Sequence, residues 1–367
     1  MKIRYAINAR IPIQRAHGLQ VMKTCEALAR AGASVELVVP RRYNAIMTDP
    51  FVYYAVEPLF RITYLPTLDL VRLGIPYAFA LQTLAFTLSL AWYLARHQDG
   101  SRLYMRGELG SLLPLMSRAP FIWENHIKWR SARAEARAVR HASGIVVVTE
   151  RYRADLIKEY GLTADEVLVA PDGVDIEQFA PAISKQDARA QLGLPLDKTL
   201  VVYTGSDVLW KGLRYLREAS NLLPEDYEVV FVGHMESAGA SSSQRFVGPR
   251  PYEEIPIWLA AADALVLTGD PASETARHYT SPMKLFEYMA ARRPIVAADL
   301  PAFRDVLSEE SAVLVAPGDP QALARGIIHA VRDAGRDTRV ERAWRAVQAY
   351  SWQRRAERIM AFVRDRT

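Results

Sequence analysis

Apolar residues fall in two series of short, strand-like runs separated by segments with helical periodicity. In the first series, residues 2–10 and Val35–Val39 have the pattern of strands, and segment 19–31 between them repeats apolar residues at helical spacing before Gly32. Because a strand–helix–strand order builds parallel sheets through right-handed crossovers, we expect these strands to pair in parallel. Further strands of this series are expected at 102–105, 120–123, 144–149 and 166–169.

A segment of different character separates the two series. Residues 171–198 contain a turn at Pro171–Asp175 and a short helix over 184–192 that ends at Gly193. The second series then places strands at 200–204, 228–232, 246–247, 264–267, 295–297 and 313–315, with helices between and after them. This alternation predicts an α/β protein with two Rossmann-like doubly wound domains, residues 1–178 and 179–349, and a terminal helix within 350–367.

Length, charge and cysteine content restrict the possible domain number, partners and compartment only in part. A chain of 367 residues suits two domains, and a formal net charge of +5 favours anionic partners. Nucleotide phosphates, anionic lipid surfaces and nucleic acid are all compatible with that charge. Cys25 is the single cysteine, which excludes an intrachain disulfide and a cysteine-based zinc site, and Met1–Tyr5 lack the apolar core of a signal peptide. We therefore expect a cytoplasmic protein.

Two segments bear on membrane contact. Ile75–Ala95 holds 21 residues without a charge, which is long enough to span a bilayer, but Pro76, Gln82 and Thr83 dilute its apolar character. We expect a buried or half-buried helix of the first domain, with contact at the inner membrane surface as an alternative and a true span as another. Arginines at 130, 133, 137 and 140 fall on one side of a helix, which fits a solvated face or an anionic lipid contact.

The strongest local signal is the start of the helix within Ser281–Ala290. Ser281 suits the N-cap and Pro282 the first helical position, so free backbone N–H groups at this helix start form an anion site. Lys284 adds a full charge, and Glu287 lies on the same helix face. A cation for phosphate and a carboxylate for ribose hydroxyls together suit a nucleotide diphosphate. The alternative is a capped surface helix with a Lys–Glu pair.

Two further loops follow strands. The loop Gly205–Gly212 lies between a strand and a helix, where parallel sheets bind ligands, and its Lys211 can meet the same diphosphate. In the first domain His126 follows a strand and is a candidate for contact with a sugar or for proton handling. A solvent-exposed loop histidine is the alternative, and the same holds for His17 beside Gly18 at the first strand–helix turn.

Several motifs are absent from the chain. It has no Gly-x-Gly-x-x-Gly at the first strand–helix turn, no P-loop, no Gly-x-Ser-x-Gly elbow and no zinc pattern. Dinucleotide oxidoreductases, P-loop ATPases and serine hydrolases are therefore disfavoured.

A series of different short motifs is distributed along nearly the whole chain. These are Gly18 with its helix, Glu124–His126, Pro171–Asp175 with Phe179, Tyr203–Gly205, Lys211–Gly212, Ser281–Ala290 followed by Pro294–Val296, Pro317–Pro320 and Tyr350–Trp352. Their order and spacing resemble the retaining glycosyltransferases of family 4, which have the GT-B fold.

The resemblance implies two domains facing across a cleft, a last helix that crosses back to the first domain, and transfer with retention and without a metal or other cofactor. Glu287 would bind the nucleotide ribose, Lys211 the diphosphate, and His126 would lie near the donor sugar. Cations and amides would stabilise the departing diphosphate. The implied donor-binding residues are Gly18, Gly205, Ser206, Lys211, Ser281, Met283, Lys284 and Glu287, and the implied catalytic residues are His126, Lys211 and Lys284.

Two positions depart from the family pattern. The first carboxylate of the Glu-x7-Glu element is replaced by Tyr279, with Glu274 nearby, and the arginine that often follows the glycine of the Lys211 loop is Ser206. The first change puts contacts to the donor hexose in doubt, and the second reduces the charge around the diphosphate.

The expected partners are a UDP- or GDP-sugar donor and an acceptor glycan, glycolipid or small alcohol, without nucleic acid. A sugar-nucleotide epimerase or a phosphorylase of similar architecture is an alternative. A non-catalytic sugar-nucleotide-binding protein is another, because Tyr279 and Ser206 replace functional family residues.

Overall fold

The computed structural model describes residues 1–71, 74, 76–129 and 131–366. The chain divides into two compact units, Met1–Pro171 with Trp352–Thr367, and Asp172–Ser351. The predicted boundaries lie at 178/179 and 349/350. Residues 172–179 fall in the second unit because Val174 and Phe179 are buried in its core.

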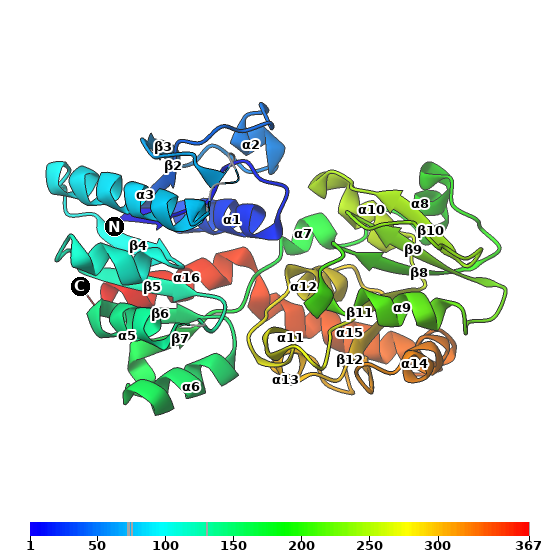
Figure 1. Ribbon diagram of the computed structural model, residues 1–367. Coiled ribbons are helices and arrows are strands. Elements are labelled where there is room, and N and C mark those ends of the chain that lie inside the picture. The colour runs from blue at the N-terminus through cyan, green and yellow to red at the C-terminus, as the bar shows by residue number, and fades with distance from the viewer. Residues whose placement is uncertain (72–73, 75, 130, 367) are drawn as a thin grey trace. The chain divides into compact units, whose positions relative to one another are not determined.

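The first unit contains a seven-stranded sheet in the order β3-β2-β1-β4-β5-β6-β7 (Figure 1). All neighbours pair in parallel. Its strands are β1 Lys2–Ile7, β2 Ser34–Pro40, β3 Arg61–Leu65, β4 Arg102–Arg106, β5 Phe121–Asn125, β6 Ala142–Val147 and β7 Val167–Val169. Its helices are α1 Ala16–Arg30, α2 Pro50–Tyr53, α3 Ala78–Arg96, α4 Leu109–Leu112, α5 Ala132–His141, α6 Glu150–Tyr160 and α16 Trp352–Arg364, with short 3-10 turns η2 Leu113–Leu115 and η3 Ala164–Glu166.

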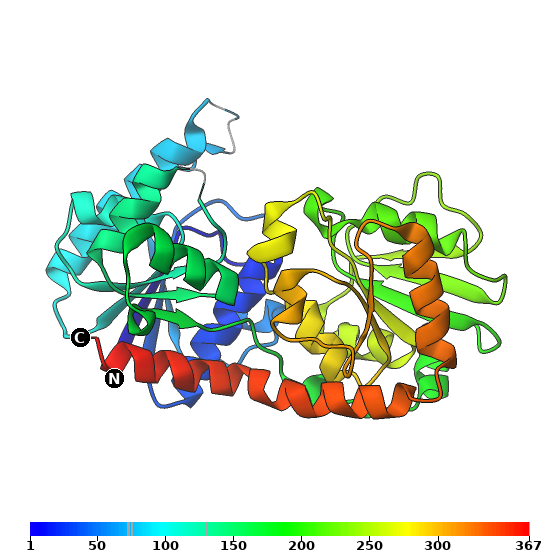
Figure 2. The ribbon, with the colours of Figure 1, turned by 90° about the horizontal axis from the view of Figure 1, so that it is seen from below.

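Helices cover both faces of this sheet. α1 and α16 pack together on one face, and α3 and α5 lie on the other (Figure 2). Because both faces are covered, β1 and β2 are buried along nearly their whole length, including one charged residue in each, Arg4 and Glu36. Strand β3 was not predicted, because as a half-exposed edge strand it lacks a continuous apolar run. β1 ends at Ile7, short of the predicted residue 10, and the side chain of Asn8 donates to Thr83 and Glu108 instead.

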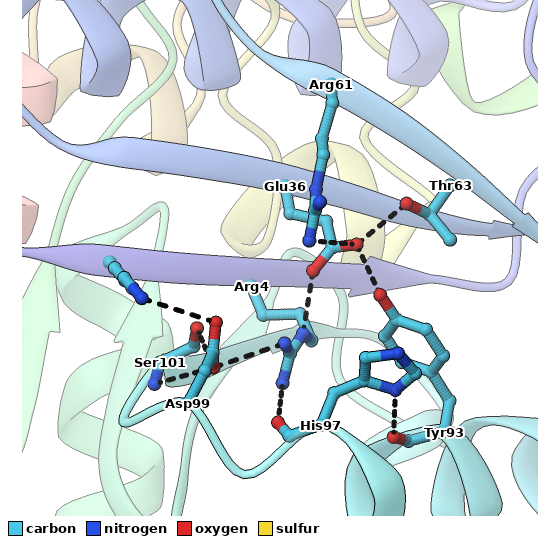
Figure 3. Close-up of polar contacts among 9 residues, drawn as sticks. Arg4, Glu36, Arg61, Thr63, Tyr93, His97, Asp99 and Ser101 are labelled. Carbon is cyan, nitrogen blue, oxygen red and sulfur yellow. Dashed lines mark hydrogen bonds and ion pairs between the residues drawn. The ribbon is translucent and has the colours of Figure 1, made fainter.

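A buried polar network fixes the end of α3 to the sheet (Figure 3). The carboxylate of Glu36 on β2 accepts hydrogen bonds from Arg4 Nε on β1 at 2.8 Å and from the Tyr93 hydroxyl on α3 at 2.6 Å. Thr63 and Arg61 on β3 bind the same carboxylate. Burial alone would raise the pKa of Glu36, but these donors lower it to about 2. The network therefore holds an ionised carboxylate that joins three strands and one helix.

The second unit contains a six-stranded parallel sheet in the order β10-β9-β8-β11-β12-β13. Its strands are β8 Thr199–Thr204, β9 Tyr227–Val232, β10 Gln244–Gly248, β11 Ala264–Leu267, β12 Ile295–Ala298 and β13 Val313–Val315. Its helices are α7 Ile176–Phe179, α8 Lys185–Leu192, α9 Leu213–Ser220, α10 Ile255–Ala260, α11 Glu274–His278, α12 Met283–Ala290, α13 Pro301–Arg304, α14 Pro320–Arg332 and α15 Arg336–Val347, with 3-10 turns η4 Leu209–Lys211, η5 Tyr252–Glu254 and η6 Gln348–Tyr350.

Successive residues of its central strands enter two different cores. Val201 and Tyr203 of β8 pack with residues of α9 and α14. Leu200 and Val202 of the same strand pack on the other face with residues of α12 and α15. The period of two places one helical layer on each face of the sheet. The two parallel sheets with their helices confirm the predicted α/β class of two Rossmann-like domains.

Candidate functional site

The start of helix α12 differs from the prediction in one detail. The helix begins at Met283, and Pro282, not Ser281, is its N-cap, without a side-chain capping bond. The hydroxyl of Ser281 instead accepts a hydrogen bond from the backbone N–H of Asp172 at 3.1 Å. Ser281 therefore holds the turn at Asp172 against this loop, and the helix start keeps backbone N–H groups that no side chain caps.

Lys284 in the first turn of α12 has a desolvated amino group. Its Nζ atom is buried and has no hydrogen-bond partner within the described part of the chain. The atom lies over the ring of Tyr203, the second-last residue of β8. Burial, and secondly the charge of Lys211, hold the pKa of Lys284 well below its ordinary value, while Glu287 opposes this shift.

Lys211 approaches from the loop after β8. Its Nζ donates to the hydroxyl of Ser206 at 2.8 Å, and burial lowers its pKa. Its backbone carbonyl accepts from Thr268, which follows β11, at 2.6 Å. Gly212 has φ +64°, and a Cβ there would lie 2.9 Å from the backbone of Gly269. Glycine thus lets this loop contact the end of β11 directly.

Gly205 belongs to a second close approach of backbones. A Cβ added to Gly233, which has φ +137°, would lie 1.7 Å from the carbonyl oxygen of Gly205. The Gly205 N–H donates to Val232, and the Asp207 N–H donates to His234. The loops after β8 and β9 are therefore tied together beneath Ser206 and Lys211.

Glu287 lies one turn further along α12 and is buried. Its Oε1 accepts a hydrogen bond from the Tyr252 hydroxyl at 3.1 Å. Burial raises the pKa of Glu287 to about 7, although Tyr252 and Lys284 act in the opposite direction. Tyr252 was not predicted as a site residue, because nothing in the sequence pattern of η5 indicates that this residue meets α12.

The two departures from the family pattern have different structural outcomes. Ser206 is the hydrogen-bond partner of Lys211, so the position that often holds an arginine instead orients a lysine. Tyr279 is buried. Glu274 is exposed and pairs with Arg277 at 3.1 Å on the surface of α11. The position of the missing carboxylate is therefore occupied by the buried aromatic side chain of Tyr279, and Glu274 points to the surface instead.

In the first unit His126 belongs to a polar cluster around Glu124. His126 Nε2 lies 2.7 Å from Glu124 Oε1, and its Nδ1 lies 2.9 Å from Arg106 Nη2. Because a guanidinium can only donate, Nδ1 accepts and Nε2 carries the proton that it donates to Glu124. Both ring nitrogens of His126 are thus engaged by neighbouring side chains.

Glu124 itself is fully buried at the end of β5. The Tyr5 hydroxyl donates to it at 2.7 Å, and the guanidinium of Arg355 on α16 pairs with it. Burial would raise the pKa of Glu124, but Arg355, His126 and Arg106 hold it well below its ordinary value. Arg355 was not predicted as a site residue because it is remote along the chain. Arg106 was not predicted either, although its position at the end of β4 is a signal visible in the sequence.

His17 and Gly18 lie at the start of α1, near the same cluster. Burial lowers the pKa of His17 to about 4, and the charges of Arg106 and Arg15 act in the same direction. A Cβ at Gly18 would lie 2.1 Å from the Tyr54 hydroxyl, which bonds to the backbone of Ile13. Packing against Tyr54 therefore explains why position 18 holds a glycine, without involving a ligand.

The structure places the predicted residues in two groups, one in each unit. In the second unit, one set of predicted residues lies at the carboxyl end of β8: Gly205, Ser206 and Lys211. The other set lies at the start of α12: Ser281, Met283, Lys284 and Glu287. Lys284 connects the two sets, because it contacts Tyr203 of β8 and is affected by the charge of Lys211. The first unit holds His126 and Gly18.

Comparison with known families covers most of the chain. Residues 18–178 match the model described as Glycosyltransferase Family 4, and residues 198–333 match the model described as Glycosyl transferases group 1. A D-inositol 3-phosphate glycosyltransferase of Xylanimonas cellulosilytica is 26% identical over 388 residues, covering 93% of this chain and 89% of that protein. The putative teichuronic acid biosynthesis glycosyltransferase TuaC of Bacillus subtilis is 29% identical over 205 residues, covering 55% of this chain and 50% of that protein.

Solved structures share the fold across the whole length. Sucrose-phosphate synthase of Thermosynechococcus elongatus superposes with a TM-score of 0.77 at 20% identity, covering 99% of this chain and 98% of that chain. HepE of Anabaena, in complex with UDP-glucose, superposes with a TM-score of 0.77 at 19% identity, covering 100% of both chains. With both halves matched by the family models and the fold shared end to end, the chain belongs to the family 4 glycosyltransferases of the GT-B fold.

Proposed function

We propose that the chain transfers a sugar from a nucleotide-diphosphate donor, a UDP- or GDP-sugar, to an acceptor hydroxyl with retention of configuration. The observation that carries this proposal is the buried Nζ of Lys284, which has no hydrogen-bond partner among the described residues while Lys211 is close enough to depress its pKa. Two desolvated cations beside an uncapped helix start suit a compact anion with more than one charge. A diphosphate is such an anion.

Each residue of the second unit then has a chemical task. The backbone N–H groups at Met283 and Lys284 and the two lysine ammonium groups would bind the diphosphate, whose charge grows as the sugar bond breaks. The Glu287 carboxylate would accept hydrogen bonds from the ribose hydroxyls. His126, oriented by Arg106 and Glu124, would contact the donor sugar. No protein nucleophile, metal or other cofactor takes part in this scheme.

The names of related proteins support the donor and acceptor classes. HepE binds UDP-glucose, and relatives of this chain act on D-inositol 3-phosphate or in teichuronic acid biosynthesis. We infer a glycan, a glycolipid or a small alcohol as the acceptor, in polysaccharide, glycolipid or glycoconjugate synthesis. The single cysteine, Cys25, fits a reaction in the cytoplasm.

The test is turnover of a donor panel containing UDP-glucose, UDP-N-acetylglucosamine and GDP-mannose, each with an acceptor mixture. We expect nucleotide release that depends on acceptor, and a product whose anomeric configuration by NMR equals that of the donor. An altered sugar without nucleotide release would indicate an epimerase. Binding without turnover of any donor would indicate a non-catalytic protein, and an inverted product would refute retention.

A further inference from the structure

Helix α3 carries apolar side chains on its exposed face as well as on its buried face. Along one face it exposes large apolar side chains, with exposed fractions of 46% for Leu81, 40% for Leu84, 53% for Leu88 and 58% for Trp92. Its face toward the sheet buries Phe86 and Leu90. The same face also buries the polar residues Gln82, Thr83 and Thr87, each 2% exposed or less. Exposed residues at 77, 81, 84, 88 and 92 follow the i, i+3 or i+4 spacing of a single stripe, which we name the α3 stripe.

The buried polar residues of α3 have partners inside the first unit. Thr83 donates to the carbonyl of Phe79 and accepts from Asn8, and Thr87 donates to the carbonyl of Thr83. Tyr93 is bound to Glu36, as Figure 3 shows. These contacts explain the inner face and hold α3 on the sheet. They do not explain the α3 stripe, since its half-exposed leucines forgo part of the free energy that burial of apolar surface would supply.

Basic charge is concentrated in the same unit. The first unit contains 27 lysine and arginine residues against 16 acidic ones, a formal charge of +11, whereas the second has 19 against 25, a charge of −6. α3 has no acidic residue, and Arg96 at its end stacks on Trp92 at 4.2 Å. α5, on the same face of the sheet (Figure 2), exposes Arg133 and Arg140; the third predicted basic residue, Arg137, is half-buried, and residue 130 lies outside the described residues.

An apolar stripe beside arginines suits an anionic lipid surface. Within the described part of the chain, α3 is the one helix long and apolar enough to cross a bilayer, with 39% of its apolar window buried. Its hydrogen bonds to the sheet argue against a span. A second copy of this unit would bring another charge of +11 against the stripe, which disfavours self-association.

We propose that the α3 stripe, with Arg96, Arg133 and Arg140, docks the first unit on an anionic membrane surface, with the leucines and Trp92 at the boundary between headgroups and acyl chains. Trp92 at one end of the stripe and Tyr77 at the other, 84% exposed, are residues favoured at that boundary. This surface is independent of the donor site in the second unit. The membrane-docking proposal and the proposed transfer reaction can therefore fail independently of each other.

The test is co-sedimentation of the full chain with vesicles of phosphatidylcholine alone or mixed equally with phosphatidylglycerol. We expect binding to the mixed vesicles and weak binding to phosphatidylcholine. Changing both Leu84→Glu and Leu88→Glu should weaken binding by about 10-fold or more, because two charges would enter an apolar layer. The matched control is Leu196→Glu with Leu222→Glu, two exposed leucines of the second unit, which should bind as the wild type does.

Two further measurements keep the outcome decisive. Brominated lipids should quench fluorescence of the wild type more than that of Trp92→Phe, a change that leaves the helix intact. Arg133→Glu with Arg140→Glu should reduce binding to mixed vesicles only. Equal binding by the Leu84/Leu88 variant and the control would overturn the proposal. A wild-type dimer in light scattering that becomes a monomer in the Leu84/Leu88 variant would also overturn the proposal, since the α3 stripe would then bind a second copy of the chain.

Discussion

The ammonium nitrogen of Lys284 lies 3.7 Å from the centre of the Tyr203 ring. This contact joins the carboxyl end of a central strand to the first turn of α12. An aromatic face returns about 0.5–2 kcal/mol to a desolvated cation, which is less than the several kcal/mol lost on leaving water. Lys284 is therefore held at a net cost in the ligand-free protein, and an anion bound beside it would offset that cost.

Replacing Lys284 by methionine should stabilise the ligand-free protein. The change keeps the length and apolar stem of the side chain but removes the buried charge, so we expect the free energy of unfolding to rise by about 1–3 kcal/mol. Thermal unfolding of the purified variant without nucleotide measures this. Tyr203→Phe, which keeps the ring, is the control and should leave the effect of Lys284→Met unchanged. A lower midpoint in Lys284→Met would show that the lysine stabilises the protein even without ligand.

Lys211 and Glu287 should affect different kinetic quantities. Lys211→Ala should lower kcat strongly, by about 100-fold, because it removes charge stabilisation on the leaving diphosphate. Glu287→Ala should chiefly raise KM for the donor, because ribose contacts are made in the ground state and in the transition state alike. Steady-state kinetics with saturating acceptor separates the two. Arg277→Ala, a surface change on α11, is the control, and wild-type constants in both test variants would remove these residues from the site.

Glu287 should make stability fall as pH rises. Its pKa is about 7 in the folded protein, above the ordinary glutamate value, so the folded state binds more protons between these two values. The associated stability is present below about pH 4.5 and is lost, by about 3 kcal/mol, as pH rises to about 7. Denaturant titrations across this range should show the fall in the wild type and a much smaller one in Glu287→Gln.

Glu36 supplies a control of opposite sign. Its folded pKa of about 2 lies below the ordinary value, so its contribution is present above about pH 4.5 and is lost as pH falls toward 2. Glu36→Gln should therefore flatten the acid side of the profile and leave the change between pH 4.5 and 7 intact. A Glu287→Gln profile that parallels the wild type throughout would contradict the assignment.

Gly233 should tolerate no side chain. A Cβ at this position would lie 1.7 Å from the Gly205 carbonyl oxygen, so Gly233→Ala should separate the loops after β8 and β9 and cost about 3 kcal/mol or more. Gly239→Ala is the matched control, because Gly239 also has positive φ, +70°, but nothing lies within 4 Å of its added Cβ. That change should cost about 1–2 kcal/mol. Equal unfolding midpoints for the two variants would argue against this close approach.

Much of the fold could be predicted because parallel strands and their helices have strong local patterns. β8, β9 and β11 are nearly continuous apolar runs, and α12 follows with apolar residues at helical spacing. Edge strand β3 escaped prediction because its residues are only half-buried. Pro282 in place of Ser281 as N-cap could not be foreseen either, because the competing partner of Ser281, the Asp172 N–H, lies 109 residues away.

Residues of the site could be predicted only where they lie within one loop or at the start of one helix. Lys211, Lys284 and Glu287 follow strands or begin a helix, and such positions are visible in the sequence. The residues that tune them come from elsewhere: Tyr252 reaches Glu287 from η5, and Arg355 reaches Glu124 across 231 residues. Pairings of this kind depend on tertiary packing, which no local pattern encodes.

Calorimetric titration of UDP into the wild type and into Lys284→Met measures whether the buried lysine contributes to nucleotide binding. If Lys284 and Lys211 form a diphosphate site, the wild type binds UDP and the variant binds it at least about 10-fold more weakly, while uridine alone binds both equally weakly. The same UDP dissociation constant in both proteins would show that Lys284 does not belong to a diphosphate site.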